Sequence, residues 1–174
     1  MGGKYVLKKY RFGFDICGLV LFFLIMIPNF VWFVVPAPHD ILRVESVTLV
    51  VDNIASIAQV VMVVGLCIFR NIGREKIRIT NFIIVTTVCS LIYFLCWILY
   101  YLGITNVGVI LGLTIFPCLA FLFYSFDRKN MFAFVPALIF MICHLVYAII
   151  NYIVCKFRFI GSPIPLATDQ CFRS

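Results

Sequence analysis

Residues 14–35 have the sequence FDICGLVLFFLIMIPNFVWFVV, and this stretch decides the fold class. An α-helix rises 1.5 Å per residue, so these 22 residues would extend about 33 Å. That is slightly more than the roughly 30 Å hydrocarbon core of a bilayer. Basic residues precede the stretch, as they do in a secretory signal peptide, but the apolar part of such a signal spans only about 7–15 residues. We therefore expect a retained first transmembrane helix.

Four more apolar stretches follow, and each is long enough to cross a membrane. The basic segment 70–79, the uncharged link 102–106 and the polar turn 127–130 separate them. We predict an all-α fold, namely a polytopic transmembrane helical bundle in which residues 1–174 form a single transmembrane domain. Its five helices are expected at about 14–35, 47–69, 80–101, 107–126 and 131–154.

Local signals support these boundaries. Pro36 and Pro38 end the first helix, because proline lacks an N–H and forces the preceding residue toward extended backbone. Asp40 is a candidate N-cap for the chain that follows. Gly108 and Gly112 have the G-x-x-x-G spacing that lets the fourth helix approach a neighbour closely.

The composition supports a lipid-facing surface. Hydrophobic residues make up 64% of the chain and charged residues 12%, whereas soluble domains carry about 25% charge. The net charge of +7 does not indicate nucleic-acid binding, because the Lys and Arg residues lie at the ends of apolar runs rather than in an exposed groove. We expect the lipid bilayer as a partner and no nucleic acid.

The motifs of common enzymes and metal sites do not occur in the sequence. It contains no H-E-x-x-H, G-x-S-x-G or P-loop, and its eight cysteines form no C-x-x-C. A Ser/His/Asp site made of Ser56 or Ser90, His144 and Asp52 has no motif context. We therefore expect no metal and no cofactor, and enzymatic activity ranks third among the hypotheses.

The distribution of basic residues predicts the orientation. With a cytoplasmic N-terminus, ten of the fourteen Lys and Arg lie in cytoplasmic segments, which is the bias that the positive-inside rule requires. Five crossings then place the C-terminus outside. The predicted location is multi-pass in a cell membrane, such as the inner or plasma membrane of a bacterium.

Polar side chains in the second helix carry the functional information. Glu45, Thr48, Asp52, Ser56 and Gln59 are spaced by three or four residues, so they share one face of an α-helix. A carboxylate inside a membrane costs about 2.5–3.5 kcal/mol even on lenient scales, so Asp52 should be protonated, hydrated or paired. Asp15 is expected near the cytoplasmic face beside Arg11, and is not counted with this group.

Polar residues of the other helices converge at a similar depth. Counting from the helix centres places most of them in the outer half of the membrane, beneath the loop 36–40, and His144 near the middle. We predict a polar cavity, open or gated toward the outside and bounded by the first, second, third and fifth helices. Its candidate residues are Asn29, Trp32, Asp52, Ser56, Gln59, Tyr93, His144 and Asn151.

Two functions fit this pattern. The cavity would handle a small molecule or an ion, in a transporter-like or ligand-binding protein that forms a homo-oligomer. Alternatively, the chain is an accessory subunit whose polar face meets a helix of a partner membrane subunit. Intramembrane Asn, Ser and Tyr often only bond a neighbouring helix, each bond contributing about 0.6 kcal/mol, so the sequence leaves both alternatives open.

Overall fold

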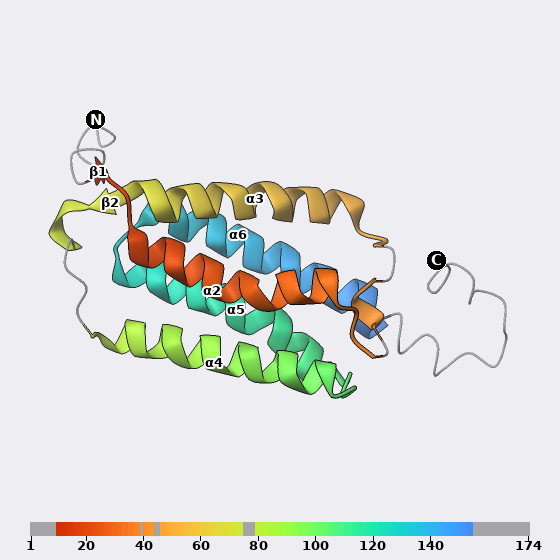
Figure 1. Cartoon of the computed structure of the whole chain (residues 1–174). Coiled ribbons are helices and arrows are strands. Elements are labelled where there is room, and N and C mark those ends of the chain that lie inside the picture. The colour runs from red at the N-terminus through yellow and green to blue at the C-terminus, as the bar shows by residue number, and fades with distance from the viewer. Residues whose placement is uncertain (1–9, 39, 44–45, 75–78, 155–174) are drawn as a thin grey trace, which may run out of the picture.

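Five long helices dominate the computed structural model (Figure 1), which describes residues 10–38, 40–43, 46–74 and 79–154. Each helix is long and apolar enough to cross a membrane. The predicted number and order of helices are thereby confirmed, with ends shifted by one or two residues. The helices are α2 (Ile16–Val34), α3 (Leu49–Ile68), α4 (Asn81–Tyr101), α5 (Val107–Asp127) and α6 (Met131–Ala148), which continues into the π-helical η3 (Ile149–Val154).

Side-chain caps define four of the helix starts. Asp15, Thr80, Asn106 and Asn130 precede α2, α4, α5 and α6, and each side chain accepts a backbone N–H of the first turn. Asp40 does not cap the second long helix. It precedes the short 3-10 turn η1 (Ile41–Arg43), and α3 starts only at Leu49.

A small β-ribbon departs from the all-α prediction. β1 (Tyr10–Phe12) pairs antiparallel with β2 (Phe69–Asn71), and the 3-10 turn η2 (Ile72–Arg74) follows. The pairing continues beyond the strands, because Gly13 and Asp15 donate their N–H groups to the carbonyls of Ile68 and Cys67 at 3.0 and 2.8 Å. Strands of three residues are too short for a period-two sequence pattern, which explains why the prediction missed them.

The helices pack in the order α3, α6, α5 and α4. In Figure 1 α3 and α4 lie on opposite sides of the bundle, and α2 lies in front of α6 and α5. Most residues of α5 are buried, whereas no more than about a third are buried in each of the other four helices. Large apolar side chains cover these outer faces, among them Ile57, Val60 and Leu91, which are 66%, 63% and 62% exposed.

Small residues bring neighbouring helices close together. A Cβ on Gly65 of α3 would lie 2.6 Å from the Phe132 carbonyl oxygen of α6, and one on Gly112 of α5 would clash with the Cys96 sulfur of α4. One glycine of the predicted pair is thus at a helix contact. Gly108 is not, because the nearest atom to its Cβ position belongs to the side chain of Asn106, at 3.4 Å.

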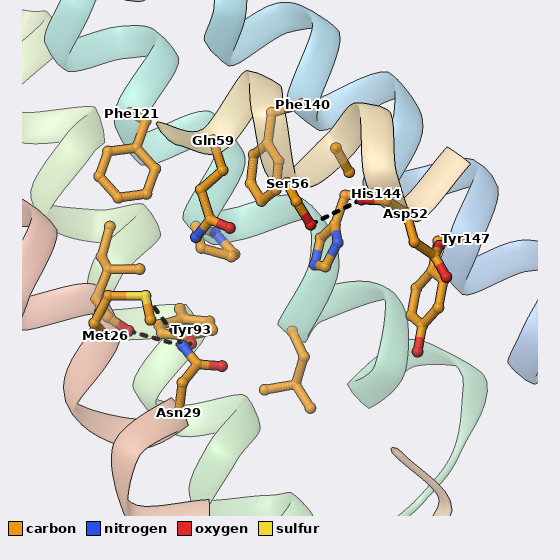
Figure 2. A pocket seen from close by; sticks show the side chains of 14 residues that line it. Met26, Asn29, Asp52, Ser56, Gln59, Tyr93, Phe121, Phe140, His144 and Tyr147 are labelled. Carbon is orange, nitrogen blue, oxygen red and sulfur yellow. Dashed lines mark hydrogen bonds between the residues drawn. The ribbon is translucent and has the colours of Figure 1, made fainter. Parts of the chain in front are cut away.

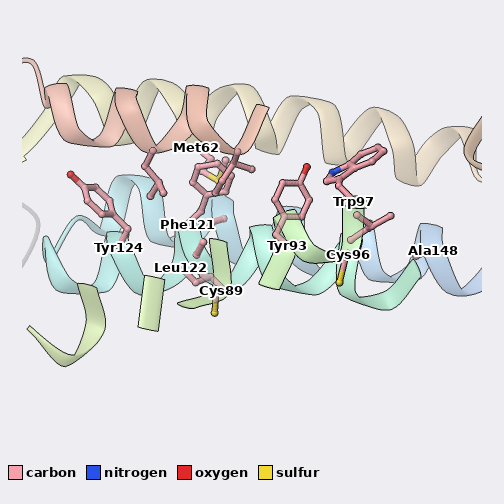
Figure 3. Packing of buried hydrophobic residues seen from close by; sticks show 14 of the residues in the cluster. Met62, Cys89, Tyr93, Cys96, Trp97, Phe121, Leu122, Tyr124 and Ala148 are labelled. Carbon is pink, nitrogen blue, oxygen red and sulfur yellow. The ribbon is translucent and has the colours of Figure 1, made fainter. Parts of the chain in front are cut away.

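Bulky side chains fill the interior between these contacts. Figure 3 shows Met62, Tyr93, Trp97 and Phe121 within the buried cluster. Met62 and Tyr93 are 0% and 2% exposed, so α3 and α4 both direct large side chains inward.

Polar contacts fix the end of the bundle that carries β1 and β2, called the ribbon end below. Asp15 lies there as the cap of α2, and its Oδ2 is 3.2 Å from Arg128 Nε in a buried ion pair. The sequence had suggested Arg11, four positions away, as its partner. Asn130 Nδ2 donates to the carbonyls of Gly65 and Phe69, each at 2.8 Å, and ties the start of α6 to the end of α3.

Candidate functional site

A pocket of about 430 Å³ lies between the helices (Figure 2). It is in the half of the bundle opposite the ribbon end. That half, where residues 35–38 and 40–43 lie, is called the far end below. All five long helices contribute to its wall, whereas four had been predicted. The lining residues are Ile25, Met26, Asn29, Asp52, Ala55, Ser56, Gln59, Tyr93, Leu113, Pro117, Phe121, Phe140, His144 and Tyr147.

The polar face of α3 forms one wall, as helical spacing predicts. The Thr48 hydroxyl, before the first turn, donates to Asp52 Oδ1 at 3.0 Å, and the Ser56 hydroxyl donates to the Asp52 carbonyl at 2.8 Å. The Gln59 amide forms no hydrogen bond with the residues that the structure describes. In Figure 2 it points into the pocket. Glu45, the other member of the predicted face, lies outside the described residues.

Asn29 and Tyr93 join α2 to α4 across the pocket. Asn29 Nδ2 donates to the Tyr93 hydroxyl at 2.7 Å and to the Ile25 carbonyl at 3.3 Å. The Asn29 oxygen points away from Tyr93 toward the open middle of Figure 2. It accepts no hydrogen bond from the described part of the chain. This amide therefore holds two helices together and still offers the pocket an acceptor.

Aromatic rings from α6 hold His144 in place. Its imidazole stacks on Phe140, with ring centroids 5.0 Å apart, and on Tyr147, with centroids 6.1 Å apart and planes within 6°. Residues 140, 144 and 147 share a helix face, so the stack follows from their spacing. Neither imidazole nitrogen is hydrogen-bonded within the described residues. A ligand could therefore donate to one nitrogen or accept from the other.

The sequence did not predict that α5 lines the pocket, because the residues that α5 contributes are apolar. Leu113, Pro117 and Phe121 line the pocket, and no polar spacing in the sequence marks them. Proline has no N–H, so Pro117 leaves the Leu113 carbonyl without its usual helical donor. The wall formed by α5 thus combines apolar side chains with a backbone acceptor that lacks its i+4 partner.

Trp32, a predicted cavity residue, does not line the pocket. Its Nε1 donates to both carboxylate oxygens of Asp40, at 3.0 and 2.9 Å, and the Arg43 guanidinium lies 5.0 Å from its ring centroid. Burial alone would raise the pKa of the Asp40 carboxyl, but hydrogen bonds from Trp32, Tyr100 and the nearby guanidinium outweigh it. The pKa of Asp40 therefore lies below its ordinary value of 3.8. Trp32 fixes the loop above the pocket.

Asn151, in η3, also lies beyond the pocket and acts on it indirectly. Its Oδ1 accepts the Val47 N–H at 2.9 Å, and its Nδ2 donates to Thr48 Oγ1, also at 2.9 Å. Thr48 in turn donates to Asp52, so Asn151 helps to orient the carboxylate that lines the pocket. Six of the eight predicted residues are thus brought together, and Trp32 and Asn151 hold neighbouring parts of the structure.

Ser56, His144 and Asp52 all line the pocket, but no hydrogen bond joins Ser56 to His144. The Ser56 hydroxyl donates to the backbone carbonyl of Asp52 instead. No group of three His, Cys, Asp or Glu side chains gathers in the part of the chain that the structure describes. No protein-family model, curated protein or solved structure matches this chain.

Proposed function

We propose that this chain is a multi-pass membrane protein that binds a small molecule or an ion in the pocket between its five helices. The N-terminus and the ribbon end face the cytoplasm, and the far end faces outward, as the distribution of Lys and Arg favours. The pocket then lies in the outer half of the membrane, and the location is a cell membrane such as a bacterial inner membrane.

One observation carries the proposal. The Gln59 amide, the His144 nitrogens and the Asn29 oxygen all border one pocket and lack partners among the described residues. Asn29, Gln59 and His144 are partly buried, and a polar group taken out of water without a hydrogen bond costs up to about 1–3 kcal/mol. Water or a ligand in the pocket would relieve that cost in each case.

Thiol accessibility tests whether the pocket is open to water. In Gln59→Cys the new thiol lines the pocket, and in the matched control Val60→Cys it lies on the exposed apolar face of the same helix. Only the thiolate reacts with maleimides, and thiolates form in water rather than in lipid. We expect N-ethylmaleimide to modify Gln59→Cys in native membranes, above the background of the unmutated chain, and to spare Val60→Cys. Preferential modification of Val60→Cys would reject the proposal.

An accessory role has one observation in its favour. Asn53 is exposed on the outer face of α3, among apolar residues such as Ile57 and Val60. An amide facing lipid is unfavourable, and a helix of a partner subunit or of a second copy would satisfy it. Asn53→Leu should then release a co-migrating partner on native gels, while Gln59→Leu should not. If both variants migrate like the wild type, the accessory role is rejected.

A further inference from the structure

We infer that the pocket is selective for small organic cations, specifically an ammonium group attached to an apolar body. This inference rests on the proposed binding function and adds the charge and chemical class of the ligand.

The charges that line the pocket indicate a positively charged ligand. Asp52 is the one carboxylate among the lining residues, and no Lys or Arg lines the pocket. Asp15 and Asp40 are each paired with an arginine, whereas Asp52 has no cationic partner among the described residues and receives only the Thr48 hydroxyl. A carboxylate removed from bulk water is stabilised by a nearby positive charge. A bound cation would supply that charge.

The other polar groups of the pocket can also receive a cation. The Asn29 oxygen is an acceptor, and the Gln59 amide and the His144 imidazole each offer an acceptor beside a donor, whereas an ammonium group is a pure donor with up to three N–H bonds. An anion would meet these oxygens and the Asp52 carboxylate without a compensating Lys or Arg in the pocket wall. The pocket therefore disfavours carboxylate and phosphate ligands.

The apolar lining of the pocket favours an organic cation over a bare metal ion. Met26, Phe121, Phe140 and Tyr147 form much of the wall, and aromatic faces attract organic ammonium groups. Metal ions of the Ca²⁺ type take six to eight oxygen ligands, and the described residues contain no cluster of three acidic or other ligating side chains. A volume of about 430 Å³ also suits an organic body rather than a single ion.

Charged thiol reagents measure this selectivity directly. Ser56→Cys places a thiol in the pocket one helical turn from Asp52, where Cβ atoms are about 6 Å apart. It is reacted with trimethylammonioethyl methanethiosulfonate, a cation, and with sulfonatoethyl methanethiosulfonate, an anion. In both reactions the thiolate forms a disulfide and expels methanesulfinate. The ratio of the two rate constants is divided by the ratio for mercaptoethanol in solution, and labelling of the unmutated chain is subtracted.

We expect the normalised ratio to favour the cation by about tenfold, since a unit charge at this distance in a partly hydrated site changes a rate by that order. Adding Asp52→Asn, which keeps an acceptor for Thr48, should bring the ratio close to one. A ratio of one in Ser56→Cys itself would overturn the cation selectivity and leave the proposed binding function standing. If neither reagent reacts, the pocket is closed to water, and both the inference and the proposed function fail.

Protection by a ligand tests the chemical class with Asp52 intact. Benzylammonium should slow the modification of Ser56→Cys, and its neutral analogue benzyl alcohol should not. Equal protection by both compounds, or none by either, would overturn the assignment to organic ammonium ligands.

Discussion

Breaking the buried ion pair at the ribbon end should strongly destabilise the bundle. Asp15 Oδ1 accepts the N–H groups of Cys17 and Gly18 at 3.2 and 3.3 Å and the Tyr124 hydroxyl at 3.2 Å. Its Oδ2 pairs with Arg128, and the two side chains are only 8% and 6% exposed. The carboxylate therefore caps α2 and fastens it to α5.

These contacts determine how much free energy of unfolding each substitution should remove. Asp15→Ala removes the cap, worth about 1 kcal/mol, and leaves a buried guanidinium without its partner. Breaking a buried pair in this way costs about 3–5 kcal/mol in total. Asp15→Asn keeps the capping bonds, since Asn caps as well as Asp, so we expect a loss of about 2–4 kcal/mol. Arg128→Met should cost about 1.5–3 kcal/mol, because the carboxylate keeps its other three donors.

Reversible unfolding in mixed micelles, with increasing sodium dodecyl sulfate and helicity followed by circular dichroism, measures these losses. The double variant Asp15→Asn/Arg128→Met should lose less stability than the sum of the two single losses. It removes both charges, whereas each single variant leaves one charge buried without its partner. A loss for Asp15→Ala of about 1 kcal/mol, matching the cap alone, would refute the buried ion pair. Strict additivity in the double variant would refute the coupling.

Three further outcomes follow from the structure. Because the pKa of Asp40 is lowered in the folded state, its ionised carboxylate stabilises the fold above pH 3.8, and this stabilisation is lost as the pH falls through the pKa of the folded state. The melting temperature of Asp40→Asn should therefore depend less on pH below about pH 4 than that of the wild type, and melting curves of both proteins check this. Gly65→Ala should lower stability by about 1–3 kcal/mol in the micelle assay, because its Cβ would meet the backbone carbonyl of Phe132; an unchanged midpoint would contradict this contact. Gly112→Ala should be destabilising alone and largely rescued by Cys96→Ala, and absence of rescue would show that the two helices do not meet there.

The fold was predictable to the extent that it depends on apolar length. Runs such as 14–35 and 107–126 are long enough to span the hydrocarbon core of a bilayer, and the structure has one long helix in each. The strands Tyr10–Phe12 and Phe69–Asn71 were not predictable, because three residues hold no periodicity and their pairing joins distant parts of the chain. The partner Arg128 lies 113 positions from Asp15, a separation for which no local pairing rule exists.

The pocket was predictable only on its polar side. Spacing placed Asp52, Ser56 and Gln59 on one helix face, and the structure lines the pocket with that face. Depth counting could not separate residues that point into the pocket from residues that hold a loop above it, so Trp32 and Asn151 were grouped with the rest. The wall made by α5 carries no polar signal, because apolar residues that line a pocket resemble apolar residues that face lipid.

Sidedness of the loops tests the central claim, a bundle that crosses the membrane five times with its far end outside. Pro38→Cys and Ile104→Cys place thiols at the far end, Ile72→Cys places one at the ribbon end, and all three positions are exposed. A membrane-impermeant maleimide should modify the first two in intact cells and the third only after permeabilisation, and a tag fused after Ser174 should be reached from outside. Modification of Ile72→Cys in intact cells together with the other two, or a tag reached only from the cytoplasm, would contradict the five crossings and with them the outward-facing pocket.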